Sequence, residues 1–380
     1  MKKILITSSD AMMYQFLLKH ALNLIGFGYS VDVAIFPAAG YEGQNYPERI
    51  KSALPAASSF FTVHTARSPL SPKNFNGYRE LKKIISSGKY DLVWTNEPVM
   101  GVLTRLASAK CRRGGMKVMY ISHGFHFYNG APLKNWLIYY PIEKLFAHFT
   151  DTVVTINSDD FKIAEKKLCC KDVRYIHGVG FDTERFENVS IDRAAKLSEL
   201  GIPNGAFTVL SVGELNENKN HSVVIDAIAE LKRNDIYYVI CGEGPLRSTL
   251  TEKIRALGLD GRVSLIGFRE DIAEICHAAD IYCAPSVREG LPVSVLEAMS
   301  CGLPVVCSAI RGNRDLIENG NGGFMCDPFD PSEFAASIEK LYFDRSLCKK
   351  FGERNYAFTE RYGCKTAEDE VKAIVDDFFD

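Results

Sequence analysis

The sequence predicts an α/β protein made of two doubly wound domains, each with a parallel sheet. Short apolar runs alternate with helical stretches along the 380 residues, and the same alternation starts again in the second half. Strands that are apolar throughout and separated by helices indicate βαβ units, whose sheets are covered on both faces. At about 150 residues per domain, the length suits two domains.

The expected elements follow each other in a regular order. The strands of the first half are predicted at residues 4–7, 31–36, 92–95, 117–121 and 152–156. The strands of the second half are predicted at residues 208–212, 237–241, 263–266, 281–284 and 305–308. Polar sequence after Gly180 separates the two sets, and we place the domain boundary there, with domains at 1–182 and 183–363. Apolar residues spaced by three and four predict an amphipathic helix over 366–379.

Composition excludes several classes of protein. Hydrophobic residues make up 46% of the chain and charged residues 24%, which excludes disordered and fibrous proteins. Charged residues such as Lys19, Lys134 and Glu143 interrupt every apolar run before it reaches the ~18 residues of a membrane-spanning helix. The eleven cysteines contain no Cys-x-x-Cys pair, so we expect no disulfide framework and no zinc site, and a cytoplasmic location.

Charge is distributed unevenly. The net charge of −2 argues against nucleic-acid binding, yet residues 1–180 carry a net +10 and residues 181–380 a net −12. A basic domain suits a phosphate-rich partner or an anionic membrane surface. Uneven surface charge without a function is the alternative.

The most informative motif lies at residues 284–304, where a strand leads through a loop into a helix. Pro292 suits the first turn of this helix and Gly302 its C-terminal cap. The free N–H groups around Gly290 and Leu291, together with the helix dipole, predict a site for a phosphate.

Two carboxylates flank this predicted site. Glu289 precedes it and Glu297 lies inside the helix, eight residues later. The two side chains can therefore contact one ligand from two sides, and a carboxylate that accepts two hydroxyl hydrogen bonds is a common way to hold ribose. The alternative is a solvated loop residue and a surface charge.

Two loops after neighbouring strands add to this motif. Lys219 stands where a helix begins, and a cation there is unfavourable for the helix dipole unless an anionic ligand shares the site. An exposed lysine in a polar loop is the alternative. Gly242 and Gly244 follow the next strand, where glycine permits close approach of a ligand to the backbone.

Together these motifs resemble retaining glycosyltransferases of the GT-B type, family 4, and are most similar to bacterial capsule and exopolysaccharide enzymes. The resemblance covers essentially the whole chain and rests on the Glu289-x7-Glu297 spacing and on segments 212–219 and 242–245. It implies two facing Rossmann-like domains, the first binding the acceptor and completed by a C-terminal helix at 364–380, the second binding the donor.

The resemblance also implies roles for individual residues. Glu289 would contact the hydroxyls of the donor sugar, Glu297 the ribose and Lys219 the diphosphate. The backbone of Gly267, Phe268 and Arg269 would contact the base of the nucleotide.

In the first domain, His123 follows the expected strand 117–121, and the resemblance makes it a contact to the sugar or the acceptor. A core or capping histidine is the alternative.

Two departures from the family pattern concern the diphosphate. Glu214 stands where many members have Arg, so Arg269 or Arg314 are candidates to assist Lys219. The usual glycine-rich loop after the first strand is replaced by the segment that begins at Ser8-Ser9.

The predicted function is retaining transfer of a sugar from a nucleoside-diphosphate sugar, with UDP as the expected nucleotide, to a hydroxyl of a lipid-linked or oligosaccharide acceptor in cell-surface polysaccharide synthesis. No Asp-x-Asp motif is present, so we expect no metal and no cofactor, because fixed positive groups can stabilise the leaving diphosphate. A non-hydrolysing nucleotide-sugar epimerase and a non-catalytic scaffold subunit are the alternatives. The sugar, the linkage and the oligomeric state are not predicted.

The segment 134–146 carries lysines near both ends and aromatic residues between them. This pattern is typical of a segment at a membrane interface and predicts peripheral contact with the inner face of the cytoplasmic membrane. A helix packed under the acceptor site is the alternative.

Overall fold

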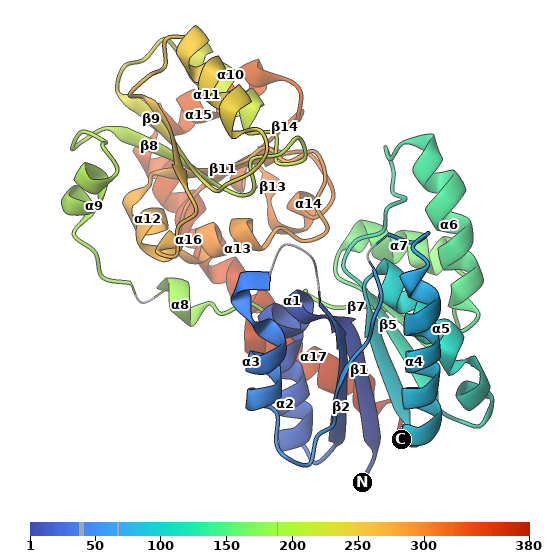
Figure 1. Cartoon of the computed structure of the whole chain (residues 1–380). Helices are drawn as coiled ribbons and strands as arrows, with labels where there is room; N and C mark the ends of the chain where they lie inside the picture. Colours follow the sequence, from blue (N-terminus) through green and yellow to red (C-terminus); the bar gives the residue numbers. More distant parts are fainter. Residues whose placement is uncertain (38–41, 67, 188) are drawn as a thin grey trace. The chain divides into compact units, whose positions relative to one another are not determined.

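The computed structural model describes residues 1–37, 42–66, 68–187 and 189–380. The chain divides into two compact units: unit 1 comprises Met1–Gly180 and Cys364–Asp380, and unit 2 comprises Phe181–Gly363. Within the described residues, each unit contains one seven-stranded sheet in which every strand pair is parallel. The predicted fold class, α/β with two doubly wound sheets, is confirmed (Figure 1).

In unit 1 the strand order is β3-β2-β1-β4-β5-β6-β7. The strands are β1 Lys3–Ser9, β2 Ser30–Phe36, β3 Phe60–Thr62, β4 Leu92–Asn96, β5 Lys117–Ser122, β6 Thr152–Thr155 and β7 Asp172–Tyr175. The helices are α1 Asp10–Met12, the π-helix η1 Met13–Leu17, α2 Leu18–Gly26, the 3-10 helix η2 Glu42–Gln44, α3 Tyr46–Ala53, α4 Lys73–Gly88, α5 Pro98–Arg113, α6 Leu133–Ala147, α7 Ser158–Lys167 and α17 Cys364–Asp376.

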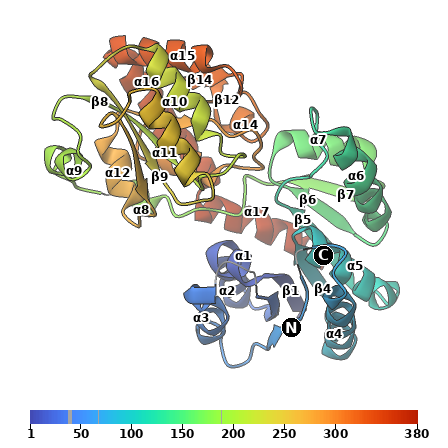
Figure 2. The same ribbon diagram turned by 45° about the horizontal axis from the view of Figure 1, so that its top comes forward.

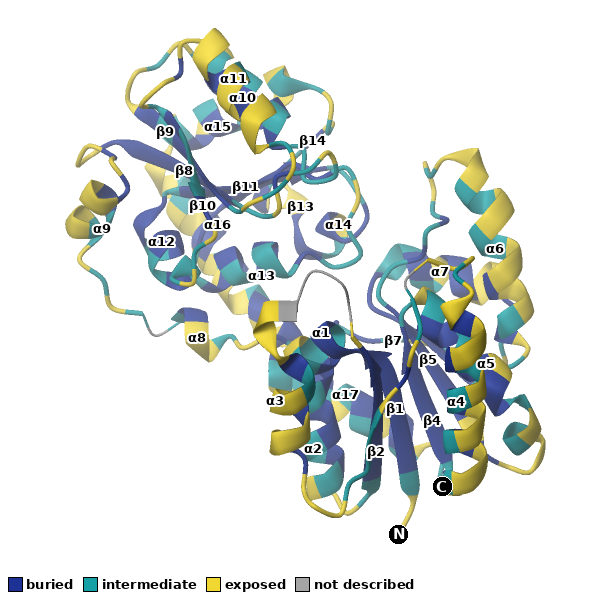
Figure 3. Cartoon of the chain, in the orientation of Figure 1, coloured by how far each residue is buried: buried dark blue, intermediate teal, exposed yellow. Residues whose placement is uncertain are grey.

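The sheet of unit 1 is buried on both faces, as its apolar strands predict (Figure 3). Helices α4 and α5 pack on one face, where Leu5 and Val93 join their core, and α2 and α17 pack on the other (Figure 1). Because successive strand residues point to opposite faces, Trp94 reaches His20 of α2, with ring centroids 5.8 Å apart.

The C-terminal helix α17 belongs to unit 1. Its apolar residues Val371, Ile374 and Val375 are buried, and α17 packs on α2. Oε1 of Glu370 accepts a hydrogen bond of 2.6 Å from Nδ1 of His177. Since residues 364–380 carry six acidic groups and two lysines, the net charge of unit 1 is +6, smaller than the +10 of residues 1–180.

In unit 2 the strand order is β10-β9-β8-β11-β12-β14-β13. The strands are β8 Phe207–Val212, β9 Ile236–Cys241, β10 Val263–Gly267, β11 Ile281–Ala284, β12 Val305–Ser308, β13 Glu318–Asn319 and β14 Gly322–Cys326. The helices are α8 Glu184–Glu187, α9 Arg193–Glu199, α10 His221–Glu230, α11 Arg247–Ala256, α12 Ile272–Ala278, α13 Val293–Ser300, α14 Asn313–Leu316, α15 Pro331–Phe343, α16 Arg345–Thr359 and the 3-10 helix η3 Glu360–Tyr362.

Two apolar clusters cover the two faces of this second sheet. Helices α10, α11 and α15 pack on one face together with Val209, and α9, α12 and α13 pack on the other together with Leu210 (Figure 2). The C-terminal end of α13 is followed by Gly302 at φ +71°, which fits the capping role that the sequence predicts.

Candidate functional site

In each sheet, the strand order reverses between two neighbouring strands: β1 and β4 in unit 1, and β8 and β11 in unit 2. At such a switch point the loops that follow the two strands turn away from each other and leave room for a ligand at the carboxyl ends. The sequence motifs after β8 and β11 therefore lie at the switch point of unit 2. The loops after β1 and β4 occupy the equivalent place in unit 1.

The loops after β8 and β11 are joined by hydrogen bonds. The N–H of Val287 donates to the carbonyl of Asn218 at 2.8 Å, and Nδ2 of Asn218 donates to the carbonyl of Arg288 at 3.0 Å. These bonds bring Lys219 and Glu289 together, and Nζ of Lys219 lies 2.8 Å from Oε1 of Glu289. The sequence predicted both residues as ligand contacts but did not predict this ion pair.

Lys219 lies close against the backbone of the preceding strand end. A Cβ atom on Gly213 would stand 3.1 Å from Cδ of Lys219, so glycine at 213 leaves room for the aliphatic part of the lysine. The Lys219 side chain is 25% exposed and that of Glu289 is 15% exposed. The ammonium and the carboxylate are thus held at the switch point with one side open to solvent.

Helix α13 begins at this point without a cap. Pro292 occupies the N-cap position and its side chain accepts no hydrogen bond. In the described part of the chain, the backbone N–H groups of Gly290, Leu291 and Val293 have no hydrogen-bond partner. Uncapped N–H groups and the helix dipole together make a site for an anion.

A second loop supports the start of α13. Nε of Arg311, a buried residue, donates to the carbonyl of Glu289 at 3.1 Å. A Cβ atom on Gly312, which has φ +79°, would stand 2.6 Å from the carbonyl oxygen of Gly290. Glycine is required there because the two backbones pack in direct contact. The sequence reading named Arg269 and Arg314 as helper cations and missed Arg311.

Glu297 lies in the middle of α13 and is partly buried. No hydrogen bond or ion pair to its carboxyl group is found among the described residues. Burial raises the pKa of Glu297 to about 7, against a smaller lowering effect of the nearby Arg185. A partly buried carboxyl group without a partner retains its full capacity to accept hydrogen bonds from a ligand.

The glycines after β9 have a structural role of their own. A Cβ atom on Gly242 would overlap the carbonyl oxygen of Gly213, and one on Gly244 would lie 2.5 Å from that of Leu215. The N–H of Gly242 also donates to the carbonyl of Gly267 at 2.8 Å. Packing between loops therefore accounts for Gly242 and Gly244 without any ligand.

Phe268 and Arg269 follow β10, and Arg314 lies on α14. Phe268 is 72% exposed. The guanidinium of Arg269 forms ion pairs with Asp271 and Glu199, and Arg314 is exposed and donates to the carbonyl of Ala309 at 2.6 Å. Two carboxylates neutralise Arg269, whereas Lys219 is paired with Glu289 alone, so the Arg269 side chain is poorly suited to assist Lys219.

In unit 1, His123 follows β5 beside the β1/β4 switch point. Its Nε2 lies 3.1 Å from Oδ1 of Asn96, the last residue of β4. Burial lowers the pKa of His123 to about 4, so the imidazole is neutral near pH 7. Nε2–H donates to Asn96, and Nδ1 is left as an acceptor without a partner among the described residues.

Glu97 is a residue of this region that the sequence analysis missed. It has φ +65°, a rare backbone conformation for a residue other than glycine. Its carboxylate accepts hydrogen bonds from the N–H and the hydroxyl of Ser9, the latter at 2.9 Å. Ser9 caps the short helix α1, so a carboxylate of the protein occupies the place where a glycine-rich loop would receive an anion. A glutamate between a buried strand and a proline was the available signal.

The described residues contain neither a cluster of metal-binding side chains nor a helix that could cross a membrane. No group of three or more His, Cys, Asp or Glu side chains that could hold a metal ion occurs among the residues that the structure describes. Within the same ranges, every helix is too short or too polar to cross a membrane.

Comparison with known proteins identifies the family. Residues 192–358 match the family described as glycosyl transferases group 1, and residues 16–185 match glycosyltransferase family 4. The putative glycosyltransferase EpsD of Bacillus subtilis is 39% identical over 335 residues, which cover 87% of this chain and 88% of EpsD. The Escherichia coli UDP-Gal:α-D-GlcNAc-diphosphoundecaprenol α-1,3-galactosyltransferase is 29% identical, with 76% of each chain covered.

Among solved structures, Anabaena HepE in complex with UDP superposes with a TM-score of 0.79 at 20% sequence identity, over 99% of this chain and 100% of HepE. This likeness supports the fold and the sequence comparisons support the activity. The chain therefore belongs to the group 1, family 4 glycosyltransferases, enzymes with two Rossmann-like domains of the GT-B type.

Proposed function

We propose that this glycosyltransferase moves a hexose from a UDP-sugar to a hydroxyl of a sugar that is linked to a lipid through a diphosphate, in cell-surface polysaccharide synthesis and with retention of configuration. The observation that supports the donor site is a set of polar groups on α13 that have no partner among the described residues: the N–H groups at its start and the carboxyl group of Glu297. The name of the E. coli relative, with UDP-Gal as donor and a diphosphoundecaprenol-linked acceptor, supports both substrate classes.

Each polar group at the switch point of unit 2 has a role in this proposal. Glu297 accepts hydrogen bonds from the ribose, and the N–H groups of Gly290 and Leu291 bind the diphosphate. Lys219 also contacts the diphosphate, and Glu289, held by that lysine at 2.8 Å, accepts hydrogen bonds from the donor sugar. The base lies on the backbone of 267–269, next to the loops that Gly242 and Gly244 hold in place.

The chemical step needs stabilisation of the charge that develops on the leaving diphosphate. Preorganised N–H dipoles at the start of α13 and the Lys219 ammonium supply this without a metal, because they are fixed before the reaction and need little reorganisation. The acceptor hydroxyl attacks the anomeric carbon on the face from which UDP leaves, and the departing phosphate oxygen takes its proton. This course gives retention without a nucleophile from the protein.

The acceptor binds to unit 1 in this proposal, with His123 as a hydrogen-bond acceptor. Because the pKa of His123 is lowered to about 4, the imidazole carries a single proton near pH 7. The contact of Nε2 with Oδ1 of Asn96 places that proton on Nε2, so Nδ1 can accept a hydrogen bond from a sugar hydroxyl. The bond from Nε2 to Asn96 fixes the orientation of the ring.

Helix α6 provides the membrane contact. The aromatic residues of α6, from which the sequence predicted a membrane interface, point inward. Trp136 and Tyr140 each pack on Phe127 with ring centroids 5.5 Å apart. Much of α6 is exposed (Figure 3), and the large apolar residues on its exposed side are aliphatic: Leu133, Leu137, Ile138, Ile142 and Leu145. Lys134 and Lys144 flank this side, and unit 1 is positively charged, so an anionic lipid surface on the cytoplasmic side fits it.

Sedimentation with vesicles tests this contact. We expect the wild-type protein to sediment with phosphatidylglycerol vesicles and much less with neutral ones. The double variant Leu137→Ser/Ile138→Ser should lose sedimentation, whereas Leu257→Ser, which removes an exposed leucine of unit 2, should not. Equal sedimentation of the wild type with and without vesicles would contradict the membrane contact.

A transfer assay tests the function itself. UDP release from UDP-hexoses is measured with and without a short-chain prenyl-diphosphate sugar, and the anomeric configuration of the product is read by NMR. We expect acceptor-dependent release of UDP and an α-linked product from an α-linked donor. Epimerisation of the sugar without transfer, tight binding without turnover, or an inverted product would each contradict the proposal.

A further inference from the structure

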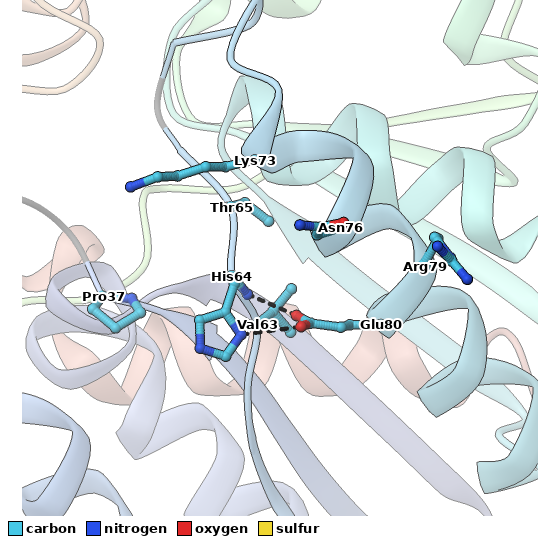
Figure 4. A pocket seen from close by; sticks show the side chains of 8 residues that line it. All are labelled: Pro37, Val63, His64, Thr65, Lys73, Asn76, Arg79 and Glu80. Carbon is cyan, nitrogen blue, oxygen red and sulfur yellow. Dashed lines mark hydrogen bonds and ion pairs between the residues drawn. The ribbon is translucent and has the colours of Figure 1, made fainter.

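Unit 1 contains a pocket away from its switch point, at the carboxyl ends of the outer strands β2 and β3. The volume of the pocket is about 660 Å³, within the usual range for small-molecule sites. Pro37 follows β2, and Val63, His64 and Thr65 follow β3 on one side of the pocket. The first turns of α4 form the other side with Lys73, Asn76, Arg79 and Glu80 (Figure 4).

Among the described residues that line this pocket, Glu80 is the acidic one, and its carboxylate is already bound. Glu80 accepts hydrogen bonds from the backbone N–H and from Nδ1 of His64, at 2.8 and 3.0 Å (Figure 4). Lys73, in contrast, has no hydrogen bond or ion pair among the described residues, and Arg79 has only a stacking contact with Phe75, at 5.9 Å. Two cations that have no counterion within the described part of the chain therefore line the pocket.

Neutral polar groups complete the lining. Asn76 is exposed and has no partner among the described residues, so its amide can donate hydrogen bonds. The hydroxyl of Thr65 is buried and makes no hydrogen bond in the same ranges, although a buried hydroxyl is normally paired. Its methyl group packs against α4 at Gly77, where a Cβ atom would overlap it.

Apolar residues lie beside the cations on the same stretch of chain. Phe75, on α4, is 64% exposed, and Leu70, just before α4, is 94% exposed. Exposed apolar side chains next to unpaired cations match a ligand with both a lipid chain and a charged group.

We propose that this pocket binds the diphosphate of the lipid-linked acceptor. A diphosphate that joins a sugar to a lipid carries two negative charges, which match Lys73 and Arg79. The exposed amide of Asn76 supplies further hydrogen bonds, and the lipid chain leaves past Phe75 and Leu70. This assignment rests on the proposed function, because it presumes a lipid-linked acceptor.

The position in the sheet agrees with this assignment. Strands β2 and β4 are separated by β1 alone, and parallel neighbours lie about 4.8 Å apart, so their carboxyl ends lie about 10 Å apart. A sugar attached to a diphosphate in the pocket can therefore extend toward Asn96 at the end of β4, which contacts His123. The pocket would hold the charge of the acceptor while its sugar reaches the switch point.

Calorimetric titration with inorganic pyrophosphate tests the pocket. Saturating UDP is present throughout, so that the donor site is filled and pyrophosphate cannot bind there. We expect pyrophosphate to bind the wild type, and Lys73→Ala/Arg79→Ala to bind it at least ~10-fold more weakly, since charge-assisted hydrogen bonds are lost. Lys82→Ala removes a lysine of α4 that does not line the pocket and should bind like the wild type.

Kinetic measurements then test whether the pocket binds the diphosphate of the lipid-linked acceptor. With a prenyl-diphosphate sugar as acceptor, the double variant should raise the acceptor KM at least tenfold and leave kcat and the affinity for UDP within threefold of the wild type. An unchanged KM, or equal pyrophosphate binding by wild type and double variant, would overturn the assignment. If UDP itself fails to bind the wild type, the proposed function fails; if UDP binds and pyrophosphate does not, only the pocket assignment fails.

Discussion

Replacing Glu297 by Gln should change the pH dependence of stability in a defined way. The substitution keeps the size of the side chain and removes its charge. Burial raises the pKa of Glu297 in the folded protein to about 7, from a reference value of 4.5. A raised carboxyl pKa means that the protonated form favours folding, so this contribution is complete below pH 4.5 and is lost as the pH rises through 7.

The magnitude follows from the two pKa values. A pKa that rises from 4.5 to about 7 corresponds to roughly 3 kcal/mol. We therefore expect Glu297→Gln to have nearly the same stability as the wild type at pH 4.5 and to be more stable by about 3 kcal/mol at pH 8.

Urea unfolding of both proteins between pH 4.5 and 8, without nucleotide, measures the difference. The variant Glu252→Gln removes an exposed carboxyl of α11 and serves as the control, with an expected change within ~0.5 kcal/mol. UDP should reduce the gain of Glu297→Gln at pH 8, because hydrogen bonds from the ribose favour the charged carboxylate of the wild type. The same stability difference at pH 4.5 and pH 8 would refute the conclusion that burial raises the pKa of Glu297.

Three further predictions concern other contacts. Lys219→Met keeps the aliphatic stem and removes the charge, so kcat for UDP release should fall about 100-fold; a kcat within threefold of the wild type would contradict its role. At position 97, Glu97→Gly and Glu97→Ala lose the same hydrogen bonds, but glycine tolerates φ +65°, so in urea unfolding it should be more stable than alanine by ~1 kcal/mol; equal stability would argue against strain. Arg105 and Glu143 form a buried ion pair of 2.9 Å between α5 and α6, so Arg105→Met alone should cost about 3–5 kcal/mol, and Glu143→Leu added to it should recover part of the loss; additive losses in a double-mutant cycle would show that the pair is not coupled.

The strands at the centre of each sheet were predictable because each contains a continuous run of mostly apolar, buried residues. β3, β7 and β13 were not predicted, since they lie at the edges of their sheets, where burial is incomplete: β7 reads Asp172 to Tyr175 with polar residues, and β13 has only two residues. β14 begins with two glycines, which weakened its strand pattern.

The candidate site was predictable where the signal is local. The loop and helix that carry Glu289 and Glu297 follow from a proline, a glycine and a strand end. The ion pair between Lys219 and Glu289 joins positions 70 residues apart and depends on the pairing of β8 with β11, which no local pattern reveals. The positive φ of Glu97 is likewise set by its neighbours in space.

The central claim is that unit 2 binds UDP along α13 through Glu297. Calorimetric titration of UDP into the wild type and into Glu297→Ala tests it most directly. We expect micromolar binding to the wild type and at least tenfold weaker binding to the variant, about 1.4 kcal/mol. Equal affinity of the two proteins for UDP, or no binding by the wild type, would contradict the claim.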